Sequence, residues 1–113
     1  MRRFLRSKIH EATVTGSRTD YEGSITIDKK LMRKAGFRKG ERVLVASIDS
    51  GARLETYIIP GEEDSGTIQM NGAAANLIGK DEKIIVMGFE IADKPTDPKK
   101  ILVNEKNRFV KYL

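Results

Sequence analysis

The chain has 113 residues, of which 39% are hydrophobic and 33% are charged, a balance typical of one globular domain with a single modest core. It has no cysteine and one histidine, which excludes a disulfide framework and any zinc site built on cysteines or on several histidines. No apolar stretch is long enough to span a bilayer, and the basic N-terminus lacks the apolar region of a signal peptide. We therefore expect a cytoplasmic protein without structural metal.

The net charge is +5, and a basic balance can indicate nucleic-acid binding. The basic residues are spread along the chain, however, and acidic residues such as Glu62 and Glu63 interrupt them. Only 6% of the residues are aromatic, and no basic-aromatic ladder for stacking bases is present. The charge pattern favours a solvated basic surface over a nucleic-acid interface, and it is also compatible with a small anionic substrate.

Short alternations of apolar and polar residues predict a chain that is mostly β. A first short helix is expected over residues 29–35, with Asp28 as its N-cap and Gly36 at its C-terminal end. A second helix of small residues is expected over residues 73–78. The predicted strands cover residues 7–15, 24–28, 41–48, 53–59, 67–70, 83–91, 101–103 and 109–112, with the strand 53–59 ending at Pro60. Many short strands separated by turn signals favour a small closed barrel.

The bond between Gly23 and Ser24, at the start of the strand 24–28, places a hydroxyl next to an unhindered carbonyl. Glycine lacks a Cβ, so its backbone reaches strained conformations that are closed to other residues. Ser24 Oγ could then attack the carbonyl carbon of Gly23 and break the chain, which would leave a new terminal group at position 24. Gly-Ser is also a common turn dipeptide, so the bond taken alone favours the alternative, a glycine turn into a strand.

Two sets of polar residues share a strand face through period-two spacing. In the first set, Arg53 could hold a carboxylate with two hydrogen bonds and Tyr57 could donate a proton; the alternative is the solvated face of an edge strand. In the second set, Lys8 and His10 lie on one side of the N-terminal strand; the alternative is two exposed residues.

The small residues of Asn71-Gly72-Ala73-Ala74-Ala75 form a third feature, at the start of the second helix. Backbone N–H groups at such a start are accessible and bind anions well. An ordinary helix entry against a crowded neighbour is the alternative.

In this order and spacing, these segments resemble the family of pyruvoyl-dependent aspartate decarboxylases. The matching stretches are Lys8-Ile9-His10, residues 21–28, residues 53–57 and residues 71–75, with residues 31–45 and 98–107 resembling the family's framework. The resemblance covers nearly the whole chain.

The resemblance implies a mainly-β fold, a small double-psi β-barrel with short helices, in a single domain of residues 1–113. It implies a homotetramer with active sites at subunit interfaces, and cleavage between Gly23 and Ser24 into a chain of residues 1–23 and a chain of residues 24–113. Thr56 would support the cleavage step, and a maturation factor is a partner that the resemblance allows.

The cofactor implied by the resemblance is a pyruvoyl group derived from Ser24, with no metal. It would form a Schiff base with L-aspartate and accept electrons as carbon dioxide leaves, giving β-alanine for pantothenate and coenzyme A biosynthesis. Tyr57 would be the proton donor. The implied substrate-binding residues are Arg53, Lys8, Asn71, Gly72, Ala73 and Ala74.

An alternative comes from another class of protein. Residues 25–41 also look like the strand-helix-strand unit of AbrB-like swapped-hairpin DNA-binding modules, which bind DNA through basic loops. That resemblance covers a small part of the chain and leaves the other motifs unexplained. A DNA-binding module also has no reason to split into two chains.

Overall fold

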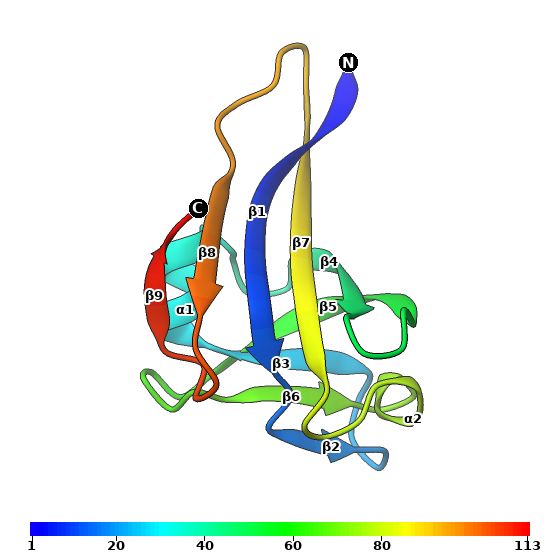
Figure 1. The fold of residues 1–113 in the computed structure, drawn as a ribbon. Coiled ribbons are helices and arrows are strands. Elements are labelled where there is room, and N and C mark those ends of the chain that lie inside the picture. The colour runs from blue at the N-terminus through cyan, green and yellow to red at the C-terminus, as the bar shows by residue number, and fades with distance from the viewer.

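The computed structural model describes residues 1–113, which form nine strands and two short helices (Figure 1). In chain order these are β1 (Arg2–Thr13), β2 (Gly16–Arg18), β3 (Ser24–Asp28), α1 (Lys29–Ala35), β4 (Arg42–Ser47), β5 (Arg53–Gly61), β6 (Ile68–Asn71), α2 (Ala74–Leu77), β7 (Lys83–Ala92), β8 (Lys99–Val103) and β9 (Phe109–Tyr112). The expected mainly-β fold with short helices is confirmed. No helix has the length and apolar character needed to cross a bilayer.

The strands lie in the order β2-β6-β3-β5-β4-β7-β1-β8-β9. The neighbours β3 and β5, β1 and β8, and β2 and β6 are parallel, and the other pairs are antiparallel. Hydrogen bonds close this sheet on itself just past the end of β1. Thr15 N–H donates to the carbonyl oxygen of Ile68 at 2.7 Å, and Ile68 N–H donates to Thr15 Oγ1 at 3.0 Å. The expected small β-barrel is therefore present.

Asn107, in the loop before β9, adds a second tie across the barrel. Its Nδ2 donates to the carbonyl oxygens of Thr13 and Gly66, both at 2.8 Å, and its Oδ1 accepts from Thr13 N–H at 2.7 Å. The side chain is buried, so these bonds satisfy polar groups that water does not reach.

Alternate residues of each strand point into the barrel, as the period of two requires. Ile84 and Val86 of β7 are buried in the core, whereas their neighbours Ile85 and Met87 point outward. Five outward-facing side chains of β4 and β7 form what we call the apolar outer face: Leu44, Ile85, Met87, Phe89 and Ile91. Phe89 is 42% exposed and Ile91 is 61% exposed, so part of this face has no cover within the chain.

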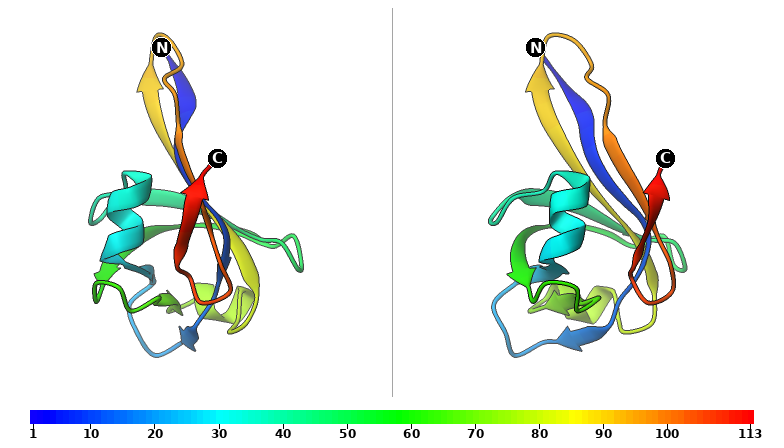
Figure 2. Two further views of the ribbon diagram at one scale, coloured as in Figure 1. Left: turned by 60° about the vertical axis from the view of Figure 1, so that its left-hand side comes forward. Right: turned by 90° about the vertical axis from the view of Figure 1, so that its left-hand side faces the viewer.

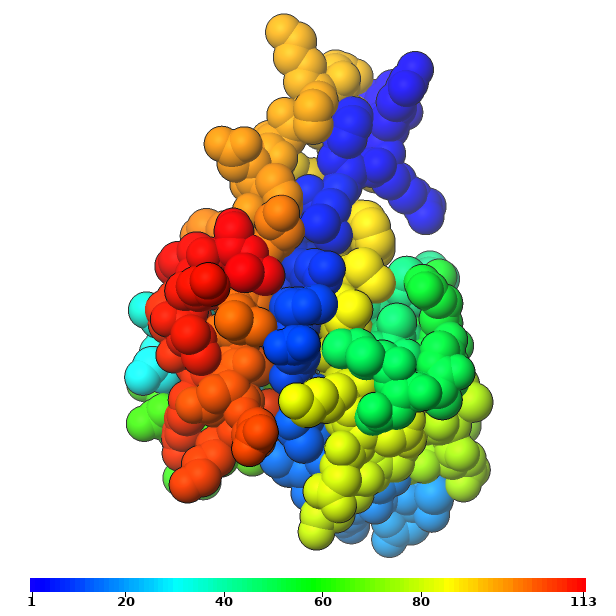
Figure 3. Space-filling view, in the orientation of Figure 1, coloured from blue at the N-terminus to red at the C-terminus, as the bar shows by residue number.

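The N-terminal part of β1 and the C-terminal part of β7 project from the barrel as a two-stranded arm (Figures 2 and 3). Arg2 pairs with Ala92, and Leu5 pairs with Phe89. The arm accounts for the elongated shape, with principal extents of 40 × 27 × 25 Å.

Helix α1 has the ends that the sequence predicts. Asp28 Oδ1 accepts a hydrogen bond from Lys30 N–H at 2.8 Å, and Gly36 adopts a left-handed conformation with φ of 80°. Leu31, Met32 and Ala35 are buried, so the helix covers one side of the barrel with its apolar face.

Several element boundaries differ from the sequence prediction, and the largest differences have a physical reason. The first strand starts at Arg2 rather than residue 7, because it pairs with β7 along the arm. Strand β5 passes through Pro60 rather than ending there; β4 accompanies it only as far as Tyr57, so Pro60 has a strand neighbour on one side only, where sheets tolerate proline. Strand β2 was not predicted, and helix α2 is shorter than expected because Ile78 is extended.

Candidate active site

Ser24 is the first residue of β3, and its side chain is completely buried. Its hydroxyl donates to the carbonyl oxygen of Glu22 at 3.1 Å, and its Oγ accepts from Asn71 Nδ2 at 2.9 Å. Asn71 pairs with Ser24 in the antiparallel ladder of β3 and β6, which brings the two side chains together. The expected nucleophile is therefore held in place by the residue that the sequence also singled out at position 71.

Gly72 packs directly against the bond that is expected to break. It has a φ of 68°, and a Cβ on this residue would lie 2.6 Å from the Cα of Gly23 and 3.0 Å from the carbonyl oxygen of Tyr21. Only glycine fits such a close approach in this backbone conformation. Gly72 N–H donates to the carbonyl oxygen of Arg18 at 2.7 Å, so this N–H holds the segment before Ser24 and is not free for a ligand.

Tyr57 and Thr56 come directly before the residues of β5 that pair with β3. The parallel ladder of β3 and β5 begins with the pair Ile25 and Ile58. Continuing this register back beyond the ladder would bring Tyr57 level with Ser24 and Thr56 level with Gly23. Tyr57 is 39% exposed, so its ring is open to solvent on the outer side of the sheet.

Arg53 lies on β5 and shares the outward face of Tyr57 and Glu55, as their alternation predicts. Glu55 forms an ion pair with Arg42, whereas Arg53 has no acidic partner in the chain. The guanidinium of Arg53 is exposed and available to an anion.

Lys8 is on the same outer side of the barrel but far from the serine. It pairs with Met87 of β7, Met87 pairs with Leu44 of β4, and Leu44 pairs with Glu55 of β5. Three strand spacings separate Lys8 from β5, which is about 14 Å. One chain thus groups Ser24 with Asn71, and it leaves Lys8 several strands away.

Ala73 and Ala74 follow Gly72 at the start of α2, where Ala75 N–H donates to the carbonyl oxygen of Gly72 at 3.0 Å. This short helix has no side-chain cap. The two alanines therefore lie beside the Gly23–Gly72 contact.

Two further residues join the Ser24–Asn71 contact, and the sequence analysis did not identify them. Asn71 Nδ2 also donates to Thr26 Oγ1 at 3.0 Å, and Gln69 Nε2 donates to Asn71 Oδ1 at 2.8 Å. The available signal was spacing: Thr26 is two residues after Ser24, and Gln69 is two residues before Asn71. If the two strands pair, all four side chains share one face.

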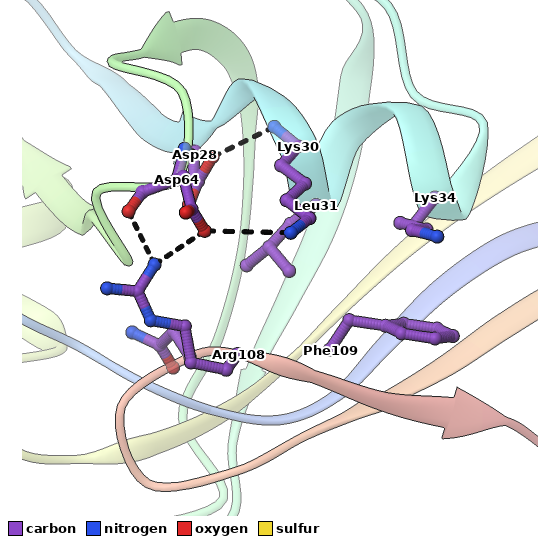
Figure 4. Close-up of a pocket in the computed structure, with 8 residues that line it drawn as sticks. Asp28, Lys30, Leu31, Lys34, Asp64, Arg108 and Phe109 are labelled. Atoms are coloured by element: carbon purple, nitrogen blue, oxygen red, sulfur yellow. Dashed lines mark hydrogen bonds and ion pairs between the residues drawn. The ribbon is translucent and has the colours of Figure 1, made fainter.

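A separate pocket of about 150 Å³ lies at the other end of β3 (Figure 4). Its centre is the buried carboxylate of Asp28, which accepts backbone hydrogen bonds from Lys30, Asp64 and Gly66 at 2.8–2.9 Å. Arg108 donates to Asp64, so the polar groups here are occupied by one another. The hydrogen bonds of Asp28 therefore connect the start of α1 to the loop before β6.

Arg33 and Glu63 form an exposed ion pair outside the candidate active site. A hydrogen bond from Arg33, together with its positive charge, lowers the pKa of Glu63.

A barrel that holds a buried serine directly after an exposed glycine, with an asparagine bonded to the serine hydroxyl, has the features expected of the decarboxylase resemblance. The family model for aspartate decarboxylase matches residues 1–110, and the chain belongs to this enzyme family. The swapped-hairpin DNA-binding alternative finds no support, since β3, α1 and β4 are parts of the barrel.

Relatives named aspartate 1-decarboxylase are similar to this chain over nearly its full length. The protein of Thermotoga sp. strain RQ2 is 46% identical over 107 residues, which cover 95% of this chain and 94% of the relative. The protein of Pseudothermotoga lettingae is 46% identical over 112 residues and 97% of each chain. The protein of Kosmotoga olearia is 49% identical over 104 residues and 90% of each chain.

Proposed function

We propose that the protein converts L-aspartate to β-alanine and carbon dioxide with a pyruvoyl group made from its own Ser24. The observation that carries this proposal is the buried Ser24 hydroxyl, held by Asn71 directly after an exposed glycine, in a chain of the aspartate decarboxylase family. The product would serve pantothenate and coenzyme A biosynthesis in the cytoplasm.

The cofactor would arise by self-cleavage into chains of residues 1–23 and 24–113. Ser24 Oγ attacks the carbonyl carbon of Gly23; the new C–O bond replaces the C–N bond, and the hydroxyl proton ends on the Ser24 nitrogen. Loss of the Ser24 Cα proton then expels the Gly23 carboxylate and leaves dehydroalanine. Water replaces the nitrogen, which departs as ammonia, and a ketone remains. The oxyanion of the first step needs a hydrogen-bond donor, and Thr56, level with Gly23, is the candidate.

The residues around Ser24 fit a pyruvoyl group. Asn71 offers an amide donor that a ketone oxygen accepts as readily as the present hydroxyl oxygen does. Gly23 has open space on the side where a Cβ would lie, although its other side packs against Gly72. When formed, the group supplies a carbonyl that takes up the substrate amine and withdraws electrons as carbon dioxide leaves.

The chain's own side chains would bind the substrate and move one proton. Arg53 is exposed and unpaired, so it suits a substrate carboxylate. Tyr57 is level with Ser24 and is the candidate donor of the proton to the carbon that loses carbon dioxide. Asn71 and the segment Gly72-Ala73-Ala74 would line the pocket after cleavage, when the Asn71 amide no longer holds the Ser24 hydroxyl.

We further propose a homotetramer in which neighbouring copies complete each site. The apolar outer face is partly uncovered, and a groove of about 450 Å³ there is lined by residues that include Arg42, Leu44, Phe89 and Ile91. Lys8 lies too far from Ser24 in one chain to share its substrate, and assembly through this face would bring in a Lys8 from another copy. A maturation factor that accelerates cleavage is compatible with this scheme.

Intact-mass spectrometry after prolonged incubation tests the proposal. The wild-type protein should yield a chain ending at Gly23 and a second chain lighter than one that begins with serine. The Ser24→Ala variant is the control and should remain whole. If the wild type stays at full length, even with cell extract added, the proposed function is wrong.

A further inference from the structure

The side-chain amide of Asn71 is buried, and both of its N–H groups and its carbonyl oxygen form hydrogen bonds. The two N–H bonds go to Ser24 Oγ at 2.9 Å and to Thr26 Oγ1 at 3.0 Å, and the carbonyl oxygen accepts from Gln69 Nε2 at 2.8 Å. Exchanging N and O of this amide would break the bonds to Ser24 Oγ and from Gln69 Nε2, so the observed orientation is the one that satisfies both neighbours.

The Ser24 hydroxyl fixes the direction of the network. It has a single proton, which goes to the carbonyl oxygen of Glu22 at 3.1 Å. Ser24 Oγ can therefore only accept from Asn71, and Asn71 must present nitrogen to it. Asn71 Oδ1 then faces Gln69, which has to act as a donor. The orientation of the Ser24 hydroxyl thus depends on Gln69, which contacts Asn71 and not Ser24 itself.

Gln69 has room for this role because a glycine lies opposite. Gly16 of β2 pairs with Gln69 of β6, and a Cβ on Gly16 would lie 3.2 Å from Gln69 Oε1. The Gln69 side chain packs across the missing Cβ with its oxygen toward Gly16 and its nitrogen toward Asn71.

We propose that Gln69 and Thr26 are positioning residues for self-cleavage: together they hold the Asn71 amide with its nitrogen toward Ser24. Gln69 supplies the donor behind Asn71 Oδ1, and Thr26 supplies the acceptor for the second N–H. With the amide locked, the Ser24 hydroxyl keeps one rotamer next to the Gly23 carbonyl. This inference rests on the proposed self-cleavage at Gly23–Ser24.

The test compares cleavage rates of freshly purified, uncut variants by intact mass. Gln69→Glu keeps the size of the side chain but replaces the donor with an acceptor, whereas Gln69→Lys carries a donor only. Both variants bring a charge to the same half-buried position, so each controls for the other. Thr26→Val removes the acceptor, Thr26→Ser retains it, and Ser65→Ala removes a comparable hydroxyl contact with Thr67 outside the network.

We expect Gln69→Glu to slow cleavage by more than roughly tenfold and Thr26→Val by roughly threefold to tenfold, the range for losing one buried hydrogen bond or leaving a partner unsatisfied. Gln69→Lys and Thr26→Ser should stay within roughly threefold of the wild type, and Ser65→Ala should not change the rate. Thermal midpoints are measured in parallel. A role in packing alone would favour the isosteric Gln69→Glu over Gln69→Lys, so the order of these two variants decides.

Two outcomes overturn the inference in different ways. If the wild type cleaves and Gln69→Glu cleaves at the same rate or faster than Gln69→Lys, the positioning role is wrong and the proposed function stands. If the wild type never cleaves while Ser24→Ala behaves identically, the proposed function fails and the inference fails with it.

Discussion

Tyr57 combines exposure to solvent with a place level with Ser24, which makes its hydroxyl the sharpest target for a single-atom change. The Tyr57→Phe variant keeps the ring and removes the acid. We predict normal cleavage before Ser24 and a fall in turnover of about 10²–10⁴-fold, the usual contribution of a general acid. Steady-state kinetics on fully cleaved protein measure the effect. A loss of less than severalfold would mean that another group or water delivers the proton.

Arg53 is the one cation of β5 and lies on the same strand face as Tyr57, whereas Arg42, which pairs with Tyr57 from β4, is held in an ion pair by Glu55. We predict that Arg53→Ala removes useful decarboxylation of aspartate while the protein cleaves and folds normally. The loss of a hydrogen bond to a charged group costs about 1.5–3 kcal/mol, which corresponds to roughly a 10- to 160-fold lower kcat/KM. The matched control is Lys29→Ala, which removes a cation on α1. Unchanged aspartate kinetics in cleaved Arg53→Ala protein would refute the assignment.

Candidate site residues could be predicted from the sequence where the residue and its chain neighbours already suggest a reaction. Residues that reach the site only through the pairing of two strands could not. The Gly23–Ser24 bond and Asn71 stand out by their neighbours in the chain. Thr26 and Gln69 are ordinary polar strand residues, and they gain a role only because β3 pairs with β6 in the observed register.

Asp28 joins two elements at the end of β3 opposite to Ser24. Its carboxylate caps α1 through Lys30 N–H and holds the loop before β6 through the N–H groups of Asp64 and Gly66. We predict that Asp28→Ala lowers the free energy of unfolding by about 3 kcal/mol, since the loss of an N-cap is compounded by two unsatisfied donors.

Urea denaturation in a Ser24→Ala background measures this loss on a single, uncut species. Asp28→Asn retains one acceptor oxygen, so its free energy of unfolding should lie between those of the Ser24→Ala parent and the Asp28→Ala variant. Lys29→Ala, on the exposed side of α1, should stay within about 0.5 kcal/mol of the parent. Equal stabilities of Asp28→Ala and the parent would show that the three backbone bonds carry no net stabilisation.

Elements with local signals were predicted well. Asp28 and Gly36 define both ends of α1 through capping, which depends on nearby residues only. The beginning of β1 was missed, because Arg2 and Arg3 show no apolar alternation and become strand only by pairing with β7. Pro60 misled the prediction of β5, because its tolerance depends on where β4 ends.

In the single chain, part of the apolar outer face is uncovered and Lys8 is distant from Ser24. Both features are expected if several copies of the chain assemble. We predict a tetramer by light scattering. Co-expression of Ser24→Ala chains with Lys8→Ala chains should restore part of the activity, because a mixed interface can combine an intact Ser24 with an intact Lys8. Each variant expressed alone is the control. Active monomers, or mixtures no more active than their parents, would rule out sites shared between copies.

The tie between Thr13 and Asn107 spans 94 residues, nearly the length of the chain. Translation proceeds from the N-terminus, so a nascent chain on the ribosome presents Ser24 long before Asn107 has been made. Strand β8, which flanks β1, is also among the last parts to emerge. The Gly23–Ser24 bond is therefore made long before the residues that tie the end of β1 to the C-terminal loop. An incomplete chain released early would lack both this tie and strand β8 beside β1.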